Sequence, residues 1–246
     1  MGPAACPTCG GAGWLRFDVD IDDPRFGRSV PCACKARTLE EKRNRVLLER
    51  SNLGTLQRMT FDSFYPRENQ QSAYNRARDF AEAPDGWLVL LGNVGTGKTH
   101  LAAAIGNRRL ELAAPAVFIV VPDLLDHLRS TFAPDSETAF DDLWQSVRSA
   151  PLLILDDLGA QTTTPWAEEK LFQILNHRSM MRLPTVITSN QVLGEMHGGE
   201  RLASRIADPE LSIVVSIAGP DLRTARENPV RGISSPGRGR PRGRQT

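Results

Sequence analysis

The most informative run of this sequence is Leu88-Val89-Leu90-Leu91-Gly92-Asn93-Val94-Gly95-Thr96-Gly97-Lys98-Thr99. A short apolar segment leads into G-x-x-x-x-G-K-T, and a helix-forming segment, 101–105, follows directly. A strand, a glycine-rich loop and a helix in this order are typical of a phosphate-binding loop, whose backbone N–H groups and helix N-terminus face phosphate oxygens. A glycine-rich turn that matches by chance is the alternative, and the full match in the right context argues against it. The sequence therefore predicts a nucleoside triphosphate site.

The residues of this motif have distinct predicted roles. The Lys98 amine would reach the β- and γ-phosphates of ATP, and the Thr99 hydroxyl would hold Mg²⁺. The whole loop is expected to bind the nucleotide: Gly92, Asn93, Val94, Gly95, Thr96, Gly97, Lys98 and Thr99.

Two further apolar runs end in polar residues. Residues 152–157 are four apolar residues followed by Asp156 and Asp157. A strand that is apolar throughout is buried on both faces, as in a parallel sheet, and ligands bind at the carboxyl ends of such strands. We expect Asp156 to orient Mg²⁺ through its water shell and Asp157 to polarise the attacking water; an ordinary strand exit is the alternative. Asn190 ends the run 184–190 and is expected to hydrogen-bond the γ-phosphate or the attacking water, or else is a simple turn residue.

The remaining pattern predicts an α/β domain that opens at about Thr60. Residues 35–56 are highly charged and predict a helical connector, or an exposed helix without a partner. His100 is interpreted as packing beside the loop helix without a chemical role. Apolar periodicity predicts helices over 73–83, 122–129, 139–147 and 201–206, and strands over 116–120 and 211–217.

All four cysteines lie in the first 34 residues, as a C-x-x-C pair and a C-x-C pair. Zn²⁺ takes four ligands in a tetrahedron, and two such pairs can supply them from tight turns. Residues 14–19 between the pairs alternate like a strand, so a small zinc ribbon-like unit is predicted. Free thiols in an unstructured segment and a redox role are the alternatives. The predicted zinc ligands are Cys6, Cys9, Cys32 and Cys34.

Composition and charge place the chain among ordinary globular proteins, with 40% hydrophobic and 24% charged residues and a net charge of +1. No apolar run approaches the roughly 20 residues of a membrane helix, and the first residues lack the basic and apolar regions of a secretory signal. We therefore expect a cytoplasmic protein. From Arg226 onward there are six arginines and one acidic residue, which predicts a disordered basic tail. The tail would hold nucleic acid or acidic protein surfaces through charge, or be solvated without a partner.

Taken in order, these motifs resemble the AAA+ ATPases, and within them the DnaC/DnaI helicase loaders and the IstB transposition ATPases. The resemblance covers roughly 58–225 and implies an α/β fold: an AAA+ P-loop parallel sheet flanked by helices, with a reduced C-terminal lid. Loaders of the DnaI type also carry a cysteine-rich zinc-binding N-terminal region. The segments that carry the resemblance are 60–64, 97–105, 121–125, 153–160 and 166–172. The expected regions are a zinc-binding region over 1–35, a helical linker over 36–57, the ATPase domain over 58–225 and the tail over 226–246.

The resemblance also implies roles for single residues. Asn190 matches the sensor 1 position, Arg205 the arginine finger, which would reach the γ-phosphate of a neighbouring subunit, and Arg223 sensor 2. A finger used across an interface implies self-association; a surface ion pair is the alternative for each arginine. Gln161 stands where relatives commonly have glutamate, which weakens the expectation of fast hydrolysis. The segment that contacts single-stranded DNA in loaders corresponds to 122–149, which is acidic here.

These features predict an ATP-hydrolysing helicase loader with ATP, Mg²⁺ and structural Zn²⁺ as cofactors. Its expected partners are a replicative DNA helicase, DNA in single-stranded form and further copies of the chain, with no membrane. The alternative is an IstB-like transposition regulator that binds DNA and activates a transposase. A small-molecule phosphotransferase on the same loop is a third possibility, disfavoured because kinases of that type need a lid and an acceptor pocket.

Overall fold

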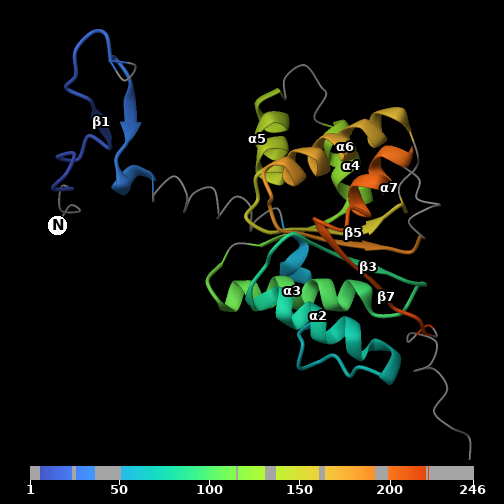
Figure 1. The fold of residues 1–246 in the computed structure, drawn as a ribbon. Helices are drawn as coiled ribbons and strands as arrows, with labels where there is room; N and C mark the ends of the chain where they lie inside the picture. The colour runs from blue at the N-terminus through green and yellow to red at the C-terminus, as the bar shows by residue number, and fades with distance from the viewer. Residues whose placement is uncertain are drawn as a thin grey trace, which may run out of the picture.

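The computed structural model describes residues 6–23, 26–36, 51–114, 116–130, 137–160, 164–191, 199–219 and 221. They form two units, an N-terminal unit over 6–36 and an ATPase domain that begins at 51 (Figure 1). Among these residues, no helix has the length and apolar character needed to cross a membrane.

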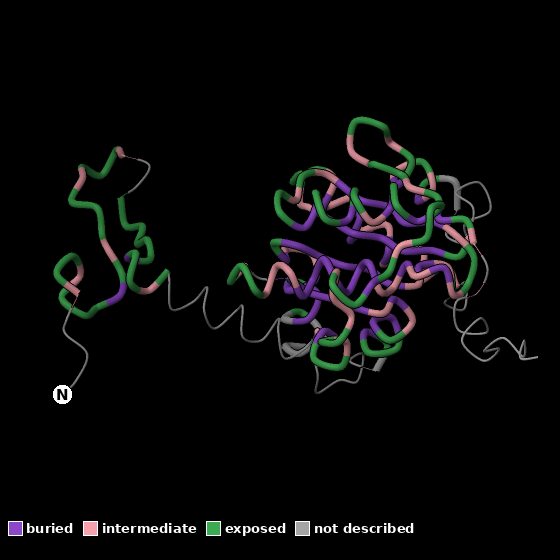
Figure 2. The backbone as a smooth tube through the Cα atoms, turned by 90° about the horizontal axis from the view of Figure 1, so that it is seen from below, coloured by how far each residue is buried: buried purple, intermediate pink, exposed green. Residues whose placement is uncertain are grey.

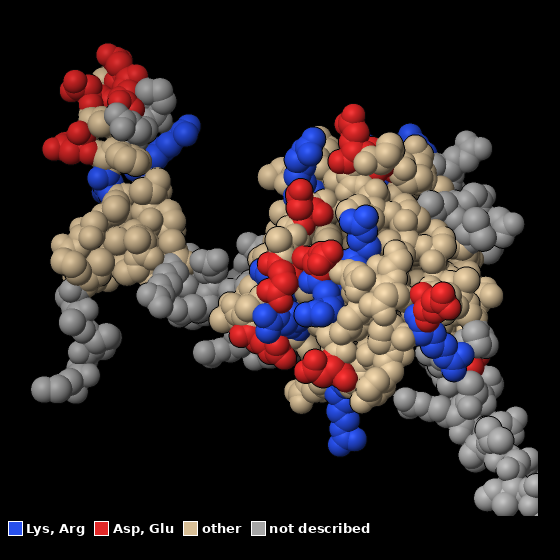
Figure 3. All heavy atoms as spheres, turned by 60° about the horizontal axis from the view of Figure 1, so that its bottom comes forward, with Lys and Arg blue, Asp and Glu red and all other residues tan. Residues whose placement is uncertain are grey.

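The N-terminal unit is a two-stranded antiparallel ribbon. β1 (Trp14–Arg16) pairs with β2 (Ser29–Pro31), with Leu15 opposite Val30. The strand expected over 14–19 is therefore only three residues long. The segment between the strands contains Asp18, Asp20, Asp22 and Asp23, and acidic side chains gather at that end of the unit (Figure 3).

The ATPase domain is built on a five-stranded sheet in the order β4-β5-β6-β3-β7, and every neighbouring pair of strands is parallel. The parallel sheet predicted from the sequence is confirmed. Its central strands are apolar on both faces, and helices pack on both faces. The strands are β3 (Trp87–Leu91), β4 (Val117–Val120), β5 (Leu153–Leu158), β6 (Thr185–Ser189) and β7 (Ser212–Ser216).

Helices cover both faces of this sheet (Figure 1). One face carries α2 (Gln71–Glu82) and α3 (Lys98–Glu111), together with the 3-10 helix η1 (Asn52–Leu56); a second 3-10 helix, η2 (Glu68–Gln70), precedes α2. The other face carries α4 (Val121–Ser130), α5 (Glu137–Arg148), α6 (Pro165–Met180) and α7 (Gly199–Ile206).

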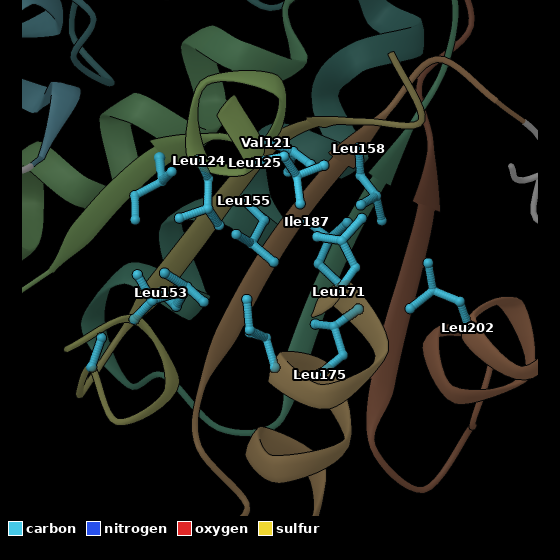
Figure 4. Packing of buried hydrophobic residues seen from close by; sticks show 14 of the residues in the cluster. Val121, Leu124, Leu125, Leu153, Leu155, Leu158, Leu171, Leu175, Ile187 and Leu202 are labelled. Carbon is cyan, nitrogen blue, oxygen red and sulfur yellow. The ribbon is translucent and has the colours of Figure 1, made fainter. Parts of the chain in front are cut away.

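Alternation along the strands divides the core into two clusters. Val89 on β3 and Leu155 on β5 pack toward α4, α6 and α7, whereas Leu90 and Ile154 pack toward α2 and α3. Figure 4 shows the first cluster, in which Leu171 of α6 lies beside the strands. Most buried residues belong to this domain, whereas most residues of the N-terminal unit are exposed (Figure 2). The strands that end at the candidate site are therefore packed against helices on both faces of the sheet.

The expected linker, 36–57, ends in contact with the ATPase domain. Residues 37–50 lie outside the described residues, but Leu53 in η1 is only 2% exposed and belongs to the α3-side core. The Ser51 hydroxyl accepts a hydrogen bond from the Phe118 backbone N–H (3.0 Å) on β4. Residues 51–56 thus pack as part of the domain rather than as an exposed connector.

A buried arginine on α6 was not anticipated from the sequence. Arg178 is fully buried, and its guanidinium donates to the carbonyl oxygens of Ala150 (2.9 Å) and Pro184 and to the Thr185 hydroxyl (2.9 Å). Further bonds reach the last carbonyls of α5, at Val147 and Arg148. Burial lowers the pKa of Arg178 to about 9, so the side chain remains charged at neutral pH. It ties the C-terminal ends of α5 and α6 to the start of β6.

Candidate nucleotide-binding site

The glycine-rich loop connects the end of β3 to the first turn of α3. Gly97 has φ +95°, and a Cβ atom built on it would lie 2.7 Å from the Phe64 ring. Only glycine satisfies both the backbone conformation and this close approach. The loop therefore has the tight curvature that lets its backbone N–H groups surround an anion.

Lys98 lies inside this loop. Its ammonium group donates to the carbonyl oxygens of Gly92 (2.7 Å) and Asn93 (2.8 Å), and the residue is buried. The cation is held at the position where the loop would receive phosphate oxygens. The predicted placement of the lysine charge is thus consistent with the geometry of the loop.

Thr99 and Asp156 meet at the start of α3, as the sequence led us to expect. The Thr99 hydroxyl donates to one carboxylate oxygen of Asp156 (3.1 Å), and the Thr188 hydroxyl donates to the other (2.6 Å). Asp156 is buried, and desolvation raises its pKa, an effect that the hydrogen bonds from Thr188 and Thr99 oppose. A divalent cation beside these two oxygen-bearing side chains would stabilise the charged carboxylate.

Asp157 and Asn190 lie together at the ends of β5 and β6. The Asn190 amide donates to the Asp157 carboxylate (2.8 Å), and the Asp157 backbone N–H donates to the Thr188 hydroxyl (2.9 Å). Asp157 has φ +60°, and the β5–β6 register shifts between Leu155 and Leu158. The register shift is a β-bulge, which locally re-aims the strand, and Asp157 at this bulge lines the cleft. Thr188 was missed in the sequence analysis, although it stands in the same polar run as Asn190.

A cleft of about 830 Å³ connects these groups. Its volume falls in the ordinary range for small-molecule sites. The cleft is lined by the carboxylates and Asn190, by the phosphate loop, and by a far wall of aromatic and other side chains. The lining residues of that far wall are Met59, Ser63, Phe64, Tyr65 and Arg67.

Residues 39–226 match the family model described as IstB-like ATP binding protein. This chain belongs to the IstB-like ATP-binding family. It is 32% identical over 178 residues to the replicative helicase loader DnaC of Escherichia coli K12, covering 68% of this chain and 72% of that protein. The replicative helicase loader DnaI of Bacillus subtilis is 32% identical over 104 residues, 42% of this chain and 32% of that protein.

Solved structures agree with this IstB-like fold. The crystal structure of the DnaC helicase loader superposes with a TM-score of 0.57 at 25% identity, covering 65% of this chain and 97% of that one. DnaA bound to AMPPCP and single-stranded DNA gives 0.58 at 23% identity, covering 65% of this chain and 50% of that one. This chain spans about half of that DnaA chain, and the likeness is one of fold. The expected AAA+ architecture is confirmed.

In this IstB-like chain, Arg205 does not join the cleft of its own molecule. It lies on α7, where its guanidinium donates to the Asn176 side-chain oxygen on α6 (3.0 Å). One turn earlier, the Arg201 guanidinium lies over the Phe172 ring, 5.5 Å from its centroid. Of the other residues singled out, Arg223, Gln161 and the basic tail lie outside the described residues.

The four cysteines of the N-terminal unit come together. Their sulfur atoms all lie within 4.8 Å of one another, at 3.9 Å for Cys6–Cys32 and 3.5 Å for Cys9–Cys34. Zn–S bonds of about 2.3 Å in a tetrahedron place sulfurs roughly 3.8 Å apart, so the spacing fits zinc. Backbone N–H groups of Cys9 and Thr8 lower the pKa of Cys6 to about 6, whereas the Cys34 pKa rises to about 12 through its hydrogen bond with Cys9. A cation among them would favour the thiolate at every position.

Proposed function

We propose that this protein is an ATP-dependent loader of a replicative DNA helicase. The observation that carries the proposal is a phosphate-loop cleft with its lysine, threonine and carboxylates in one place, in a chain 32% identical to a replicative helicase loader over 72% of that protein. In this site Lys98 lies inside the loop and Thr99 is hydrogen-bonded to Asp156. The ATPase domain would act as the switch, and the N-terminal unit would dock on the helicase.

The cleft supports slow, Mg²⁺-dependent hydrolysis of ATP. Thr99 and Asp156 would hold Mg²⁺, Asp156 through water, and the ion would supply neutralisation of phosphate charge. Lys98 would exchange its two carbonyl partners for phosphate oxygens. Asp157 would accept a proton from the attacking water while Asn190, which is hydrogen-bonded to the Asp157 carboxylate, orients that water.

Hydrolysis would also require a second copy of the chain. Arg205 is absent from the residues that line its own cleft, and its described hydrogen bond is with a neutral partner, Asn176. We infer that Arg205 completes the site of a neighbouring molecule by approaching its γ-phosphate. Arg223 is assigned to nucleotide sensing on the family resemblance alone.

Structural zinc in the N-terminal unit is the third part of the proposal. Cys6, Cys9, Cys32 and Cys34 would hold one ion, with the spacing given above. The ion would supply the cross-link between the two ends of a ribbon that has three-residue strands. Cysteine thiolates are ligands that Zn²⁺ favours.

A transposition regulator is the second candidate function. The family model that covers 39–226 is described as IstB-like, and the same ATP-driven switch would serve a transposase in place of a helicase. DNA, in single-stranded form for a loader, is a partner under either function. The partner protein separates the two candidates.

The test mixes the purified full-length protein with the replicative helicase of its host, with and without ATP, and measures the complex by light scattering after size exclusion. A loader forms a complex whose stability changes with ATP, and Lys98→Ala removes the ATP response while leaving the N-terminal unit intact. No ATP-sensitive complex at concentrations well above micromolar overturns the proposal, and binding to the transposase of a neighbouring gene supports the second candidate.

A separate measurement tests the catalytic roles. Asp157→Asn is expected to bind ATP and fail to hydrolyse it, whereas Lys98→Ala is expected to lose ATP binding. Arg205→Ala alone should bind ATP normally and turn over slowly. Mixing Arg205→Ala with Asp157→Asn should restore part of the activity, because some interfaces would pair an intact Arg205 with an intact Asp157. No recovery despite co-assembly would mean that Arg205 acts within its own molecule or only structurally.

A further inference from the structure

His100 connects the two walls of the nucleotide cleft. It follows Thr99 in the first turn of α3, and successive helical residues are rotated by about 100°, so the two side chains leave the helix in different directions. Thr99 faces Asp156, whereas the His100 ring faces the segment 60–64. The helix thus contacts the metal side of the cleft with one residue and its far wall with the next.

Two polar contacts and one ring contact hold this connection. The His100 Nε2 atom lies 3.0 Å from the Thr60 carbonyl oxygen and 3.1 Å from the Ser63 hydroxyl. Because a carbonyl only accepts, Nε2 carries the hydrogen. The His100 ring meets the Phe64 ring edge-on, with centroids 5.1 Å apart at 73°.

The same wall is fixed to the phosphate loop at other points. Phe64 is buried, stacks on Tyr74 with centroids 5.9 Å apart, and fills the space beside Gly97. Further along the wall, the buried Gln70 side chain donates to the Thr96 carbonyl oxygen (3.0 Å). The wall is therefore in contact with both the phosphate loop and α3.

The chemistry of the wall fits the base end of a nucleotide. With the phosphates on the loop and the metal beside Thr99 and Asp156, the base would face the remaining lining residues of the cleft. These residues include Met59 and Tyr65. Tyr65 is 82% exposed although it lines the cleft, so its ring is available to a planar group. Planar bases stack on aromatic faces, and thioethers pack favourably against rings.

We propose that His100 is a positioning residue that sets the distance between the base-binding wall and the phosphate-binding loop. His100 lines the cleft, and we assign its effect on binding to its contacts with Thr60, Ser63 and Phe64. The inference rests on the proposed binding of ATP. Its consequence is selective: loss of His100 weakens binding of ligands that span both walls and spares ligands that occupy the loop alone.

The test compares ATP with inorganic tripolyphosphate, both with Mg²⁺, on the full-length protein. His100→Ala is expected to raise the dissociation constant for ATP about 3- to 10-fold, the equivalent of one lost hydrogen bond, and to leave that for tripolyphosphate unchanged. His100→Gln, whose amide can donate to the Thr60 carbonyl, should recover part of the ATP affinity. His127→Ala, an exposed histidine on α4, is the matched control and should change neither constant.

The other outcomes contradict either this inference or the proposed function. Equal weakening of ATP and tripolyphosphate places His100 in the phosphate site and overturns the inference, as does an unchanged ATP constant. If His100→Ala does not fold, Ser63→Ala carries the test, with the same expected difference between the two ligands. Failure of the unmodified protein to bind ATP removes the proposed function and the inference together.

Discussion

Different interactions stabilise the N-terminal unit and the ATPase domain. In the described residues of the N-terminal unit, Cys32 is the one buried hydrophobic side chain, while Trp14, Ile21 and Phe26 are exposed. The ATPase domain buries two apolar clusters, one on each face of its sheet. A unit of this size without a core depends on cross-links, whereas a domain with a two-sided core does not. The difference predicts that the two units respond to different changes.

The largest expected effect is loss of the N-terminal fold on removal of one sulfur ligand. Cys32→Ser, or a strong zinc chelator, should abolish zinc binding and make residues 6–36 sensitive to protease. Structural zinc sites in zinc-finger peptides contribute about 10–16 kcal/mol, more than a ribbon of this size gains from burial. Zinc content and limited proteolysis measure the effect, and ATP binding should be unchanged. A protease-resistant N-terminal unit without zinc would contradict this account.

The second effect is confined to the ATPase domain. Arg178→Ala removes the donor to several buried carbonyls and leaves a cavity, so we expect a loss of about 2–5 kcal/mol in the free energy of unfolding. Chemical denaturation with a probe of the domain measures it, and zinc content should be unaffected. Arg182→Ala, an exposed arginine in the following turn, is the control. Equal midpoints for the two variants would mean that the buried hydrogen bonds do not stabilise the domain.

The third effect is smaller and opposite in sign. The raised pKa of Asp156 means that the fold favours its protonated form, so this residue costs stability as pH rises from its unfolded value, about 3.9, through the folded value. Asp156→Asn should therefore raise the free energy of unfolding at pH 7 by up to about 1 kcal/mol, roughly 2–4 °C in melting temperature. The gain should shrink as pH falls toward 4, and Mg²⁺-dependent stabilisation by ATP should be lost. A lower melting temperature at pH 7 would mean that lost hydrogen bonds outweigh desolvation.

The smallest effect on stability is expected from exposed ion pairs on the surface of the ATPase domain. Arg108 on α3 donates to Glu82 (2.8 Å) and Glu111 (3.1 Å), and all three side chains are more than one-third exposed. The hydrogen bond from Arg108 lowers the pKa of Glu82, so any stabilisation is present above its unfolded pKa and disappears as pH falls through the folded value. Exposed pairs are screened by water and salt. We expect Glu82→Gln to leave the melting temperature unchanged at physiological salt; a salt-sensitive decrease would show that the surface does contribute.

The sheet and the phosphate site could be predicted from the sequence because their signals are local. The apolar run before Gly92, the Gly97–Thr99 motif and the carboxylates near the end of β5 are each contained in a few consecutive residues. Parallel strands place their carboxyl ends at one edge, so Thr99, Asp156 and Asn190 were expected together, and the structure brings them there. The cysteine spacing likewise predicted the cluster that the structure shows.

Residue types and their spacing along the chain thus determined the nucleotide loop, the carboxylate pair, the parallel α/β fold and the four-sulfur cluster, because each depends on short-range backbone geometry. Only the tertiary structure decided the contacts of Thr188, Arg178 and His100. Thr188 bonds to the Asp156 carboxylate and to the Asp157 backbone N–H across the β5–β6 pair, Arg178 is buried because three segments converge on it, and His100 meets residues some forty positions earlier in the chain. A polar side chain acquires such partners from packing between distant segments, and no pattern of neighbouring residues specifies that packing.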